Sequence, residues 1–212
     1  RVSRGLGDVY KRQDLRCVRY TPRLFEHVYT GTKADKKRAL EASDIGTLVR
    51  GTEMDLSKRI PSSSLQKAKM LFVFMFMMRG LPFVDLAFLH KKDLQGNVLS
   101  YRRRKTGRTL RVLLSPEALQ LVHMVSNKDE NSPYLFPILR SKDGTEAAYK
   151  EYQSALRRFN YQLSALKTHL NMSSHLSSYS ARHTWATMAY YCEIHPGIIS
   201  EAMGHSSINV TE

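Results

Sequence analysis

Cysteine is scarce in this sequence, and neither cysteine lies in a metal-binding pattern. Cys17 and Cys192 are the two cysteines among 212 residues, and no Cys-x-x-Cys or Cys/His spacing surrounds them. Disulfide scaffolds and zinc sites need clustered cysteines, or cysteines combined with histidines. The sequence therefore argues against both and is typical of a protein in a reducing compartment.

Long hydrophobic runs are also lacking. The most apolar stretch, residues 70–78, lies between Lys69 and Arg79. A membrane-spanning helix needs about twenty such residues. We therefore expect a buried helix here and no membrane partner, and no signal peptide is visible at the N-terminus.

Acidic residues are few relative to basic ones. The chain has 33 lysines and arginines but 19 aspartates and glutamates, which gives a net charge of +14. Such an excess favours a polyanionic partner, more often nucleic acid than an acidic membrane surface. The acids also form no cluster of the kind that a metal-dependent nuclease needs, and Asp85 and Glu201 form no motif.

The chain is predicted to contain one folded domain after two N-terminal segments. Residues 1–13 resemble the translated end of a transposase adaptor used to prepare sequencing libraries, and we expect them to be non-native. They carry four basic residues and one acid, so the net charge without them falls from +14 to +11. Residues 14–42 show no sustained periodicity and are predicted to be a linker. Its basic residues either follow a DNA backbone or form a solvated surface: Lys33, Lys36, Lys37 and Arg38.

Periodicity over residues 43–212 predicts a mainly α fold with a small antiparallel β-sheet. Two strands, 98–104 and 109–114, are joined by a hairpin tip, Lys105-Thr106-Gly107-Arg108. Helices are predicted over residues 43–49, 65–78, 82–89, 115–125, 149–170, 176–191 and 197–203.

Two short motifs in the last third of the chain carry the chemistry. Arg182 and His183 lie inside an apolar helix, and 22 residues after His183 a Gly-His-Ser turn presents His205. The planar guanidinium group of arginine suits phosphate oxygens, and histidine can move a proton near neutral pH. Taken separately, a buried arginine is more often a structural ion pair and a lone histidine is more often a core residue, but the pairing favours a site.

The two linked motifs resemble the signature of the tyrosine recombinase family, which includes the phage integrases. That signature is His-x-x-Arg-His-Thr-[Phe/Trp]-Ala-[Ser/Thr], followed about twenty residues later by Leu-Gly-His-[Ser/Thr]. The chain matches it from Arg182 to Thr187 and from Gly204 to Ser206, with Met203 in place of leucine. The resemblance implies the mainly helical catalytic-domain fold of this family.

The hairpin agrees with the resemblance. Family members place a lysine at this hairpin tip as the general acid for the leaving 5′-oxygen, and Lys105 lies at the matching position. A basic hairpin by itself is more often a solvated edge that prevents aggregation. With the downstream motifs present, we expect four neighbouring arginines, and His183, to contact DNA: Arg102, Arg103, Arg104 and Arg108.

Two positions depart from the family pattern. The first family arginine follows Gly-Leu and precedes an acid by three positions, but here Pro82 stands in its place before Asp85. Arg79, three residues earlier, is the predicted substitute, and the alternative is that it only ends a helix. Tyr179 replaces the leading histidine, and its hydroxyl can donate a hydrogen bond but is a poor base at neutral pH. Both departures occur in integrases of Bacteroides-type mobile elements, which the sequence resembles overall.

The family nucleophile is a tyrosine nine residues after the histidine of the Gly-His turn. That count from His205 gives position 214, whereas the sequence ends at Glu212. Tyr190 and Tyr191 precede the turn in an apolar helix and are expected in the core instead of at the reaction centre. The resemblance therefore implies a catalytic domain over 43–212, truncated at its C-terminus and inactive alone, with 14–42 as the linker from a missing core-binding domain.

The resemblance implies a reaction without metal or cofactor. A tyrosine attacks the scissile phosphate, Arg182, His205 and Arg79 stabilise the charge that develops, and Lys105 protonates the 5′-oxygen. The implied partner is double-stranded DNA, bound by a homotetramer of the full-length protein in the bacterial cytoplasm. A non-enzymatic basic DNA-binding module is the alternative, and it explains the charge but not the spacing of the motifs.

Overall fold

The computed structural model describes residues 39–50 and 63–205. Contacts within the chain divide it into residues 1–37 and 38–212, and every described residue belongs to the second unit. The predicted adaptor-derived segment 1–13 and most of the predicted linker 14–42 lie outside the described residues. The predicted domain boundaries therefore stay predictions.

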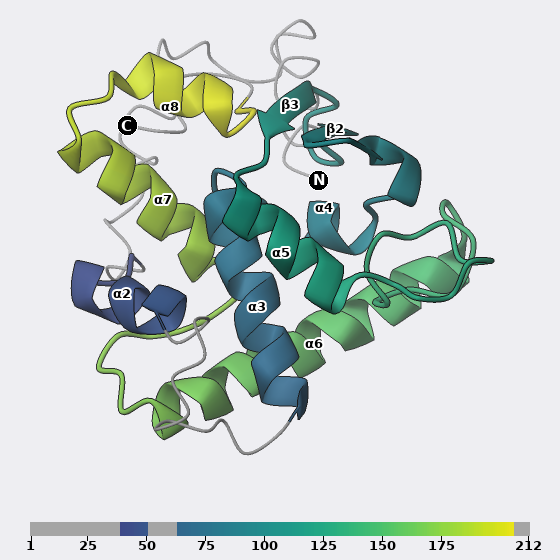
Figure 1. The fold of residues 1–212 in the computed structure, drawn as a ribbon, viewed down its shortest axis with the longest axis horizontal. Helices are drawn as coiled ribbons and strands as arrows, with labels where there is room; N and C mark the ends of the chain where they lie inside the picture. The colour runs from purple at the N-terminus through teal and green to yellow at the C-terminus, as the bar shows by residue number, and fades with distance from the viewer. Residues whose placement is uncertain (1–38, 51–62, 206–212) are drawn as a thin grey trace, which may run out of the picture. The chain divides into compact units, whose positions relative to one another are not determined.

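Helix α3 (Ser63–Met77) lies in the middle of the helical core (Figure 1). Its second half is almost continuously apolar, so it can be buried on several sides. Residues 72–75 are at most 2% exposed, and the helix packs against α5 (Pro116–Val125), α6 (Glu146–His169) and α7 (Ser180–Tyr191). Within the described ranges, no helix has the length and hydrophobicity needed to cross a membrane.

Capping fixes where α5 and α6 begin, because the Ser115 and Thr145 hydroxyl oxygens accept hydrogen bonds from the backbone N–H groups of Ala118 and Ala148. The remaining helical elements are α2 (Ala42–Arg50), α4 (Phe83–Ala87), the 3-10 turn η2 (Lys91–Asp93) and α8 (Pro196–Ala202).

A three-stranded antiparallel sheet joins α4 to α5. Its strands are β1 (Leu94–Gln95), β2 (Val98–Arg102) and β3 (Thr109–Leu113), arranged in sequence order. Residues 103–108 form the tip of the β2–β3 hairpin, which is closed by hydrogen bonds from the Arg103 N–H to the Arg108 oxygen and from the Gly107 N–H to the Arg103 oxygen, both 2.8 Å. The hairpin tip is therefore an ordered platform for Lys105.

The predicted fold class is confirmed, and the differences from the predicted elements are local. Strand β1 is two residues long, too short for an alternation signal. Pro82 is the N-cap of α4 and does not lie inside its first turn. Helix α7 begins at Ser180 instead of residue 176, because the Ser180 hydroxyl donates to the His175 oxygen and the Ser178 N–H donates to the Asn160 side chain.

The expectation that Tyr190 and Tyr191 are core residues is wrong. Their exposed fractions are 62% and 72%. Helix α7 is buried mainly around its first turn and at Ala189, so its last turn presents these two rings to solvent even though its sequence is apolar. Both rings must therefore be considered as accessible phenols.

Candidate active site

Arg182 is buried at the start of α7, where its guanidinium group links two distant parts of the chain. Its exposed fraction is 6%, Nη1 donates to the Gly80 backbone oxygen at 2.9 Å, and Nη2 donates to the Met203 backbone oxygen at 2.8 Å. Gly80 follows α3, and Met203 is the C-cap of α8. A buried cation needs such acceptors, because an unpaired one is costly to remove from water. These bonds fix the orientation of the guanidinium plane.

Gly80 is required by the close approach of α7. Its φ angle is +69°, and a Cβ atom there would lie 2.7 Å from the Arg182 Cα atom. No flexible side chain could move to relieve that contact, because the opposing atom belongs to the backbone of α7. The glycine of the Gly-Leu-Pro segment thus allows α3 and α7 to meet at Arg182.

The Gly-His turn packs directly on the hairpin tip. Gly204 has a φ angle of +66°, and a Cβ atom there would lie 3.1 Å from side-chain atoms of both Arg103 and Leu110. The Thr106 hydroxyl donates to the Gly204 backbone oxygen at 3.1 Å. This contact brings His205, which is half-buried, next to the loop that carries Lys105.

Arg103, which is expected from the sequence to contact DNA, lies buried inside this junction. Its exposed fraction is 5%, its Nε atom lies 2.7 Å from Asp85 Oδ2 in an ion pair, and its Nη1 atom donates to the Met203 backbone oxygen. Asp85 also accepts a hydrogen bond from the Arg104 N–H at 2.9 Å. Burial raises the pKa of Asp85, while this hydrogen bond and the charge of Arg103 oppose the shift.

These elements enclose a cavity of about 330 Å³ that brings together four of the five predicted catalytic residues. Lys105, Tyr179, Arg182 and His205 all line it, although they are separated by up to 100 residues in the sequence. Arg103 lines it as well. The side chains come from the hairpin tip, the start of α7 and the turn after α8.

The cavity carries a surplus of positive charge. Burial, followed by the charges of Arg182, Arg103 and Lys105, lowers the pKa of His205 to about 4, so its imidazole is neutral at neutral pH. Burial and then the charge of Arg103 lower the pKa of Arg182 to about 10, which leaves it a cation. Asp85 balances one of these charges. The arrangement is therefore suited to an anion.

Tyr179 also contacts a residue outside this cavity, and two other expected site residues, His183 and Arg79, do not line it. Tyr179 is the N-cap residue of α7 and is 50% exposed. Its ring contacts the His183 ring edge-on, with the two ring centres 4.6 Å apart. His183 lines a separate hollow together with Tyr190 and Tyr191. Arg79 is partly exposed with a φ angle of +58°, and it is not among the residues that line the Arg182 cavity.

The remaining hairpin arginines lie on the outer side of the tip. Arg104 forms a bidentate ion pair with Asp143, with N–O distances of 3.0 and 2.9 Å. Its guanidinium carbon also lies 3.8 Å from the centre of the Phe88 ring, in a cation–π contact. Arg102 donates from Nε to the Gly107 oxygen at 2.8 Å. Arg102 and Arg108 are both exposed. The outer side thus presents basic groups to solvent while Arg104 also anchors the tip.

Comparison with known proteins identifies the family. The model of the phage integrase family matches residues 52–212. The chain belongs to the phage integrase family. A search of curated proteins gave no significant match.

Solved structures with the same fold are tyrosine recombinases and integrases. XerA recombinase has 15% sequence identity to this phage integrase family member and a TM-score of 0.56, over 82% of this chain and 56% of that one. The Tn1549 transposon integrase in complex with transposon right-end DNA has 16% identity and a TM-score of 0.59, over 92% of this chain and 66% of the integrase chain. XerH site-specific recombinase bound to its difH substrate has 15% identity and a TM-score of 0.55, over 82% of this chain and 48% of the XerH chain. The chain thus spans between about half and two thirds of these proteins.

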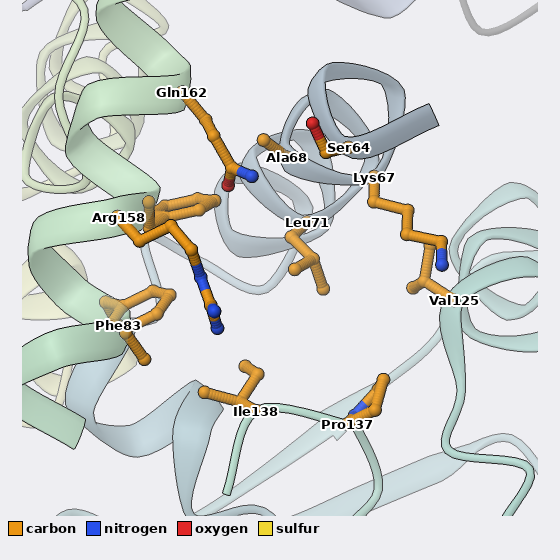
Figure 2. A pocket seen from close by; sticks show the side chains of 12 residues that line it. Ser64, Lys67, Ala68, Leu71, Phe83, Val125, Pro137, Ile138, Arg158 and Gln162 are labelled. Carbon is orange, nitrogen blue, oxygen red and sulfur yellow. The ribbon is translucent and has the colours of Figure 1, made fainter. Parts of the chain in front are cut away.

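A second cavity of this integrase-family chain, of about 320 Å³, is less suited to chemistry on an anion. It lies between α3, α5 and α6, and its walls are largely apolar, with Lys67, Arg158 and Gln162 around them (Figure 2). It includes neither Arg182 nor His205, and it shares only Phe83 with the Arg182 cavity. Within the part of the chain that the structure describes, no group of three histidine, cysteine or acidic residues could hold a metal ion.

Sequence reasoning missed the inward orientation of Arg103, although strand periodicity contains the signal. Side chains alternate between the two faces of a strand, with a period of two. Leu99, Tyr101 and Arg103 are buried, whereas Arg102 and Arg104 are exposed. Counting from the apolar Leu99 would have placed Arg103 inside this phage integrase family domain.

Proposed function

We propose that this chain is the catalytic domain of a site-specific DNA recombinase, an integrase that cleaves and rejoins DNA through a 3′-phosphotyrosyl intermediate. The proposal rests on the cavity in which Arg182, Lys105 and His205 converge with a surplus of positive charge. A DNA phosphodiester carries the single negative charge that such a cavity favours. Membership of the phage integrase family supports the same assignment.

In the proposed reaction, the scissile phosphate occupies this cavity. The tyrosine releases its hydroxyl proton to solvent as its oxygen forms a bond to phosphorus. The bond from phosphorus to the 5′-oxygen breaks, and Lys105 gives its proton to that oxygen. Arg182 donates to the non-bridging oxygens as charge accumulates on them, and His205 donates from its neutral imidazole. In the rejoining step a different 5′-hydroxyl group forms a bond to phosphorus, the bond from phosphorus to the tyrosine oxygen breaks, and the tyrosine regains a proton.

The finer parts of the proposal rest on the family resemblance. The nucleophile is a tyrosine nine residues after His205, at position 214. Tyr179 donates a hydrogen bond toward the phosphate, and Arg102 and Arg108 contact the DNA backbone. The full-length protein acts as a homotetramer on double-stranded DNA in the bacterial cytoplasm.

Lys105 is expected to be required only for a poor leaving group. In the recombinase that carries the tyrosine, Lys105→Ala should slow cleavage of ordinary DNA by about 10²- to 10⁴-fold, the usual contribution of a general acid. A substrate with sulfur in place of the 5′-oxygen should restore the rate, because a thiolate leaves without a proton. Single-turnover cleavage of the two substrates measures this difference.

The matched control for Lys105 is Arg108→Ala, which removes an exposed charge from the same hairpin tip. It should weaken binding of both substrates equally and show no preference for sulfur. If Lys105→Ala were equally slow on both substrates, Lys105 would not be the acid.

DNA binding by the chain is expected to weaken steeply as salt increases. Each phosphate contact releases condensed counterions, so the slope of log K against log salt is about −0.9 per contact. Arg102→Ala and Arg108→Ala should each make the slope shallower, whereas Lys150→Ala, which removes an exposed lysine paired with Glu146 on α6, should leave it unchanged. Titration of a labelled duplex at several salt concentrations tests this, and a flat slope would remove the electrostatic basis of the proposal.

A further inference from the structure

We propose that Arg103 is the second guanidinium group, besides that of Arg182, that contacts the scissile phosphate. It takes the role of the first family arginine, at whose position this sequence has Pro82. The inference rests on the proposed function, because it adds a residue to the same site. Pro82 also lines the cavity, but its side chain has no hydrogen-bond donor. Arg79, the substitute expected from the sequence, does not line the cavity.

The guanidinium groups of Arg103 and Arg182 meet at one backbone oxygen. Nη2 of Arg182 donates to the Met203 oxygen at 2.8 Å, and Nη1 of Arg103 donates to the same atom. Both side chains also line the cavity that contains Lys105 and His205. An anion that contacts Arg182 in this cavity therefore lies beside Arg103.

Both arginines keep hydrogen-bonding capacity for a ligand. A guanidinium group has five N–H donors. Arg103 directs Nε at Asp85 and one N–H at Met203, and Arg182 directs two N–H groups at Gly80 and Met203. Among the contacts of the described residues, each group therefore has three donors left, in the planar geometry that suits phosphate oxygens.

The charges at this junction also favour the binding of an anion. Two buried guanidinium groups repel one another, and the charge of Arg103 is one cause of the lowered pKa of Arg182. Asp85, which is 3% exposed, balances only one of them. A phosphodiester between the two arginines balances the other. Asp85 then acts as the positioning residue that holds Arg103 toward the phosphate.

The test uses the 212-residue chain with ¹⁵N-labelled arginine side chains and dimethyl phosphate, a minimal phosphodiester. We expect the guanidinium signals of Arg103 and Arg182 to shift together with a single dissociation constant. Trimethyl phosphate, which is neutral, should shift neither. Arg103→Met should weaken binding, followed on the Arg182 signals, by roughly ten- to a hundredfold, as expected for lost hydrogen bonds to a charged group. Arg140→Met, at an exposed arginine outside the cavity, should leave binding unchanged.

The outcomes separate this inference from the proposed function. If the Arg182 signals shift while those of Arg103 do not, Arg103 is only the structural partner of Asp85 and the inference is overturned, although the phosphate site stands. If neither arginine responds, the phosphate site itself is overturned. Should Arg103→Met fail to fold, the shifts of the Arg103 and Arg182 signals in the unchanged chain still distinguish these outcomes. Arg103→Lys keeps the charge but loses the planar guanidinium donors, so it should also bind dimethyl phosphate more weakly, and unchanged binding would count against the inference.

Discussion

Replacing Arg182 by alanine is expected to reduce covalent DNA-adduct formation by the recombinase about 10²- to 10³-fold, the usual loss when one donor to a developing oxyanion is removed. The guanidinium group is held by the Gly80 and Met203 oxygens before DNA binds, so it needs no rearrangement at the moment of reaction. The rate of covalent trapping on a nicked suicide substrate measures the effect.

Arg182→Lys provides the comparison for Arg182→Ala. Lysine keeps the charge but cannot bridge the Gly80 and Met203 oxygens in one plane while also donating to phosphate, so it should recover only part of the lost rate. Circular dichroism of each variant shows whether the fold is intact. A folded Arg182→Ala variant that traps DNA as fast as the unchanged protein would contradict the site.

Replacing Asp85 by alanine is expected to lower the free energy of unfolding by about 3–5 kcal/mol, because it leaves the buried Arg103 cation without its partner. The two side chains are 1% and 5% exposed, and Asp85 also accepts the Arg104 N–H. Urea denaturation of the chain measures this change. The double variant Asp85→Leu, Arg103→Met should recover much of the loss, since it removes both charges.

Asp143 offers a matched control for Asp85, because it pairs with Arg104, the neighbour of Arg103 at the same hairpin tip. Its ion pair with Arg104 is about one third exposed on each side. Such pairs contribute roughly 0.2–1 kcal/mol, so Asp143→Ala should destabilise the chain far less than Asp85→Ala. Equal losses in the free energy of unfolding for the two variants would mean that the buried Asp85–Arg103 pair contributes no more to stability than the exposed pair.

Helix positions were predictable because their signals are local. Ser115 and Pro116 begin α5 where the sequence predicts, and the continuous apolar run of α3 corresponds to the buried central helix. The starts of α6 and α7 were predicted less accurately, since they depend on capping by Thr145 and on hydrogen bonds from residues 177–180. Such contacts have no periodic pattern.

The site was predictable in its motifs but not in its contacts. The spacing of Arg182 and His205, and the family resemblance for Lys105 at the hairpin tip, indicated one site, and the structure brings the three side chains to one cavity. The assignment of a substitute for the first arginine used sequence proximity and selected Arg79. The hairpin brings Arg103, and not Arg79, to the cavity that contains Arg182, because strand alternation and the Asp85 carboxylate turn its side chain inward.

The exposure of Tyr190 and Tyr191 makes the identity of the nucleophile the most direct question about the proposed recombinase. The measurement is mass spectrometry of the peptide linked to DNA, after a suicide substrate has been trapped by the protein that carries the tyrosine at position 214. We predict that the linked peptide contains that tyrosine, joined to a 3′-phosphate. Linkage through Tyr190 or Tyr191, or to a 5′-phosphate, would contradict the assignment of this cavity as a 3′-phosphotyrosyl recombinase site.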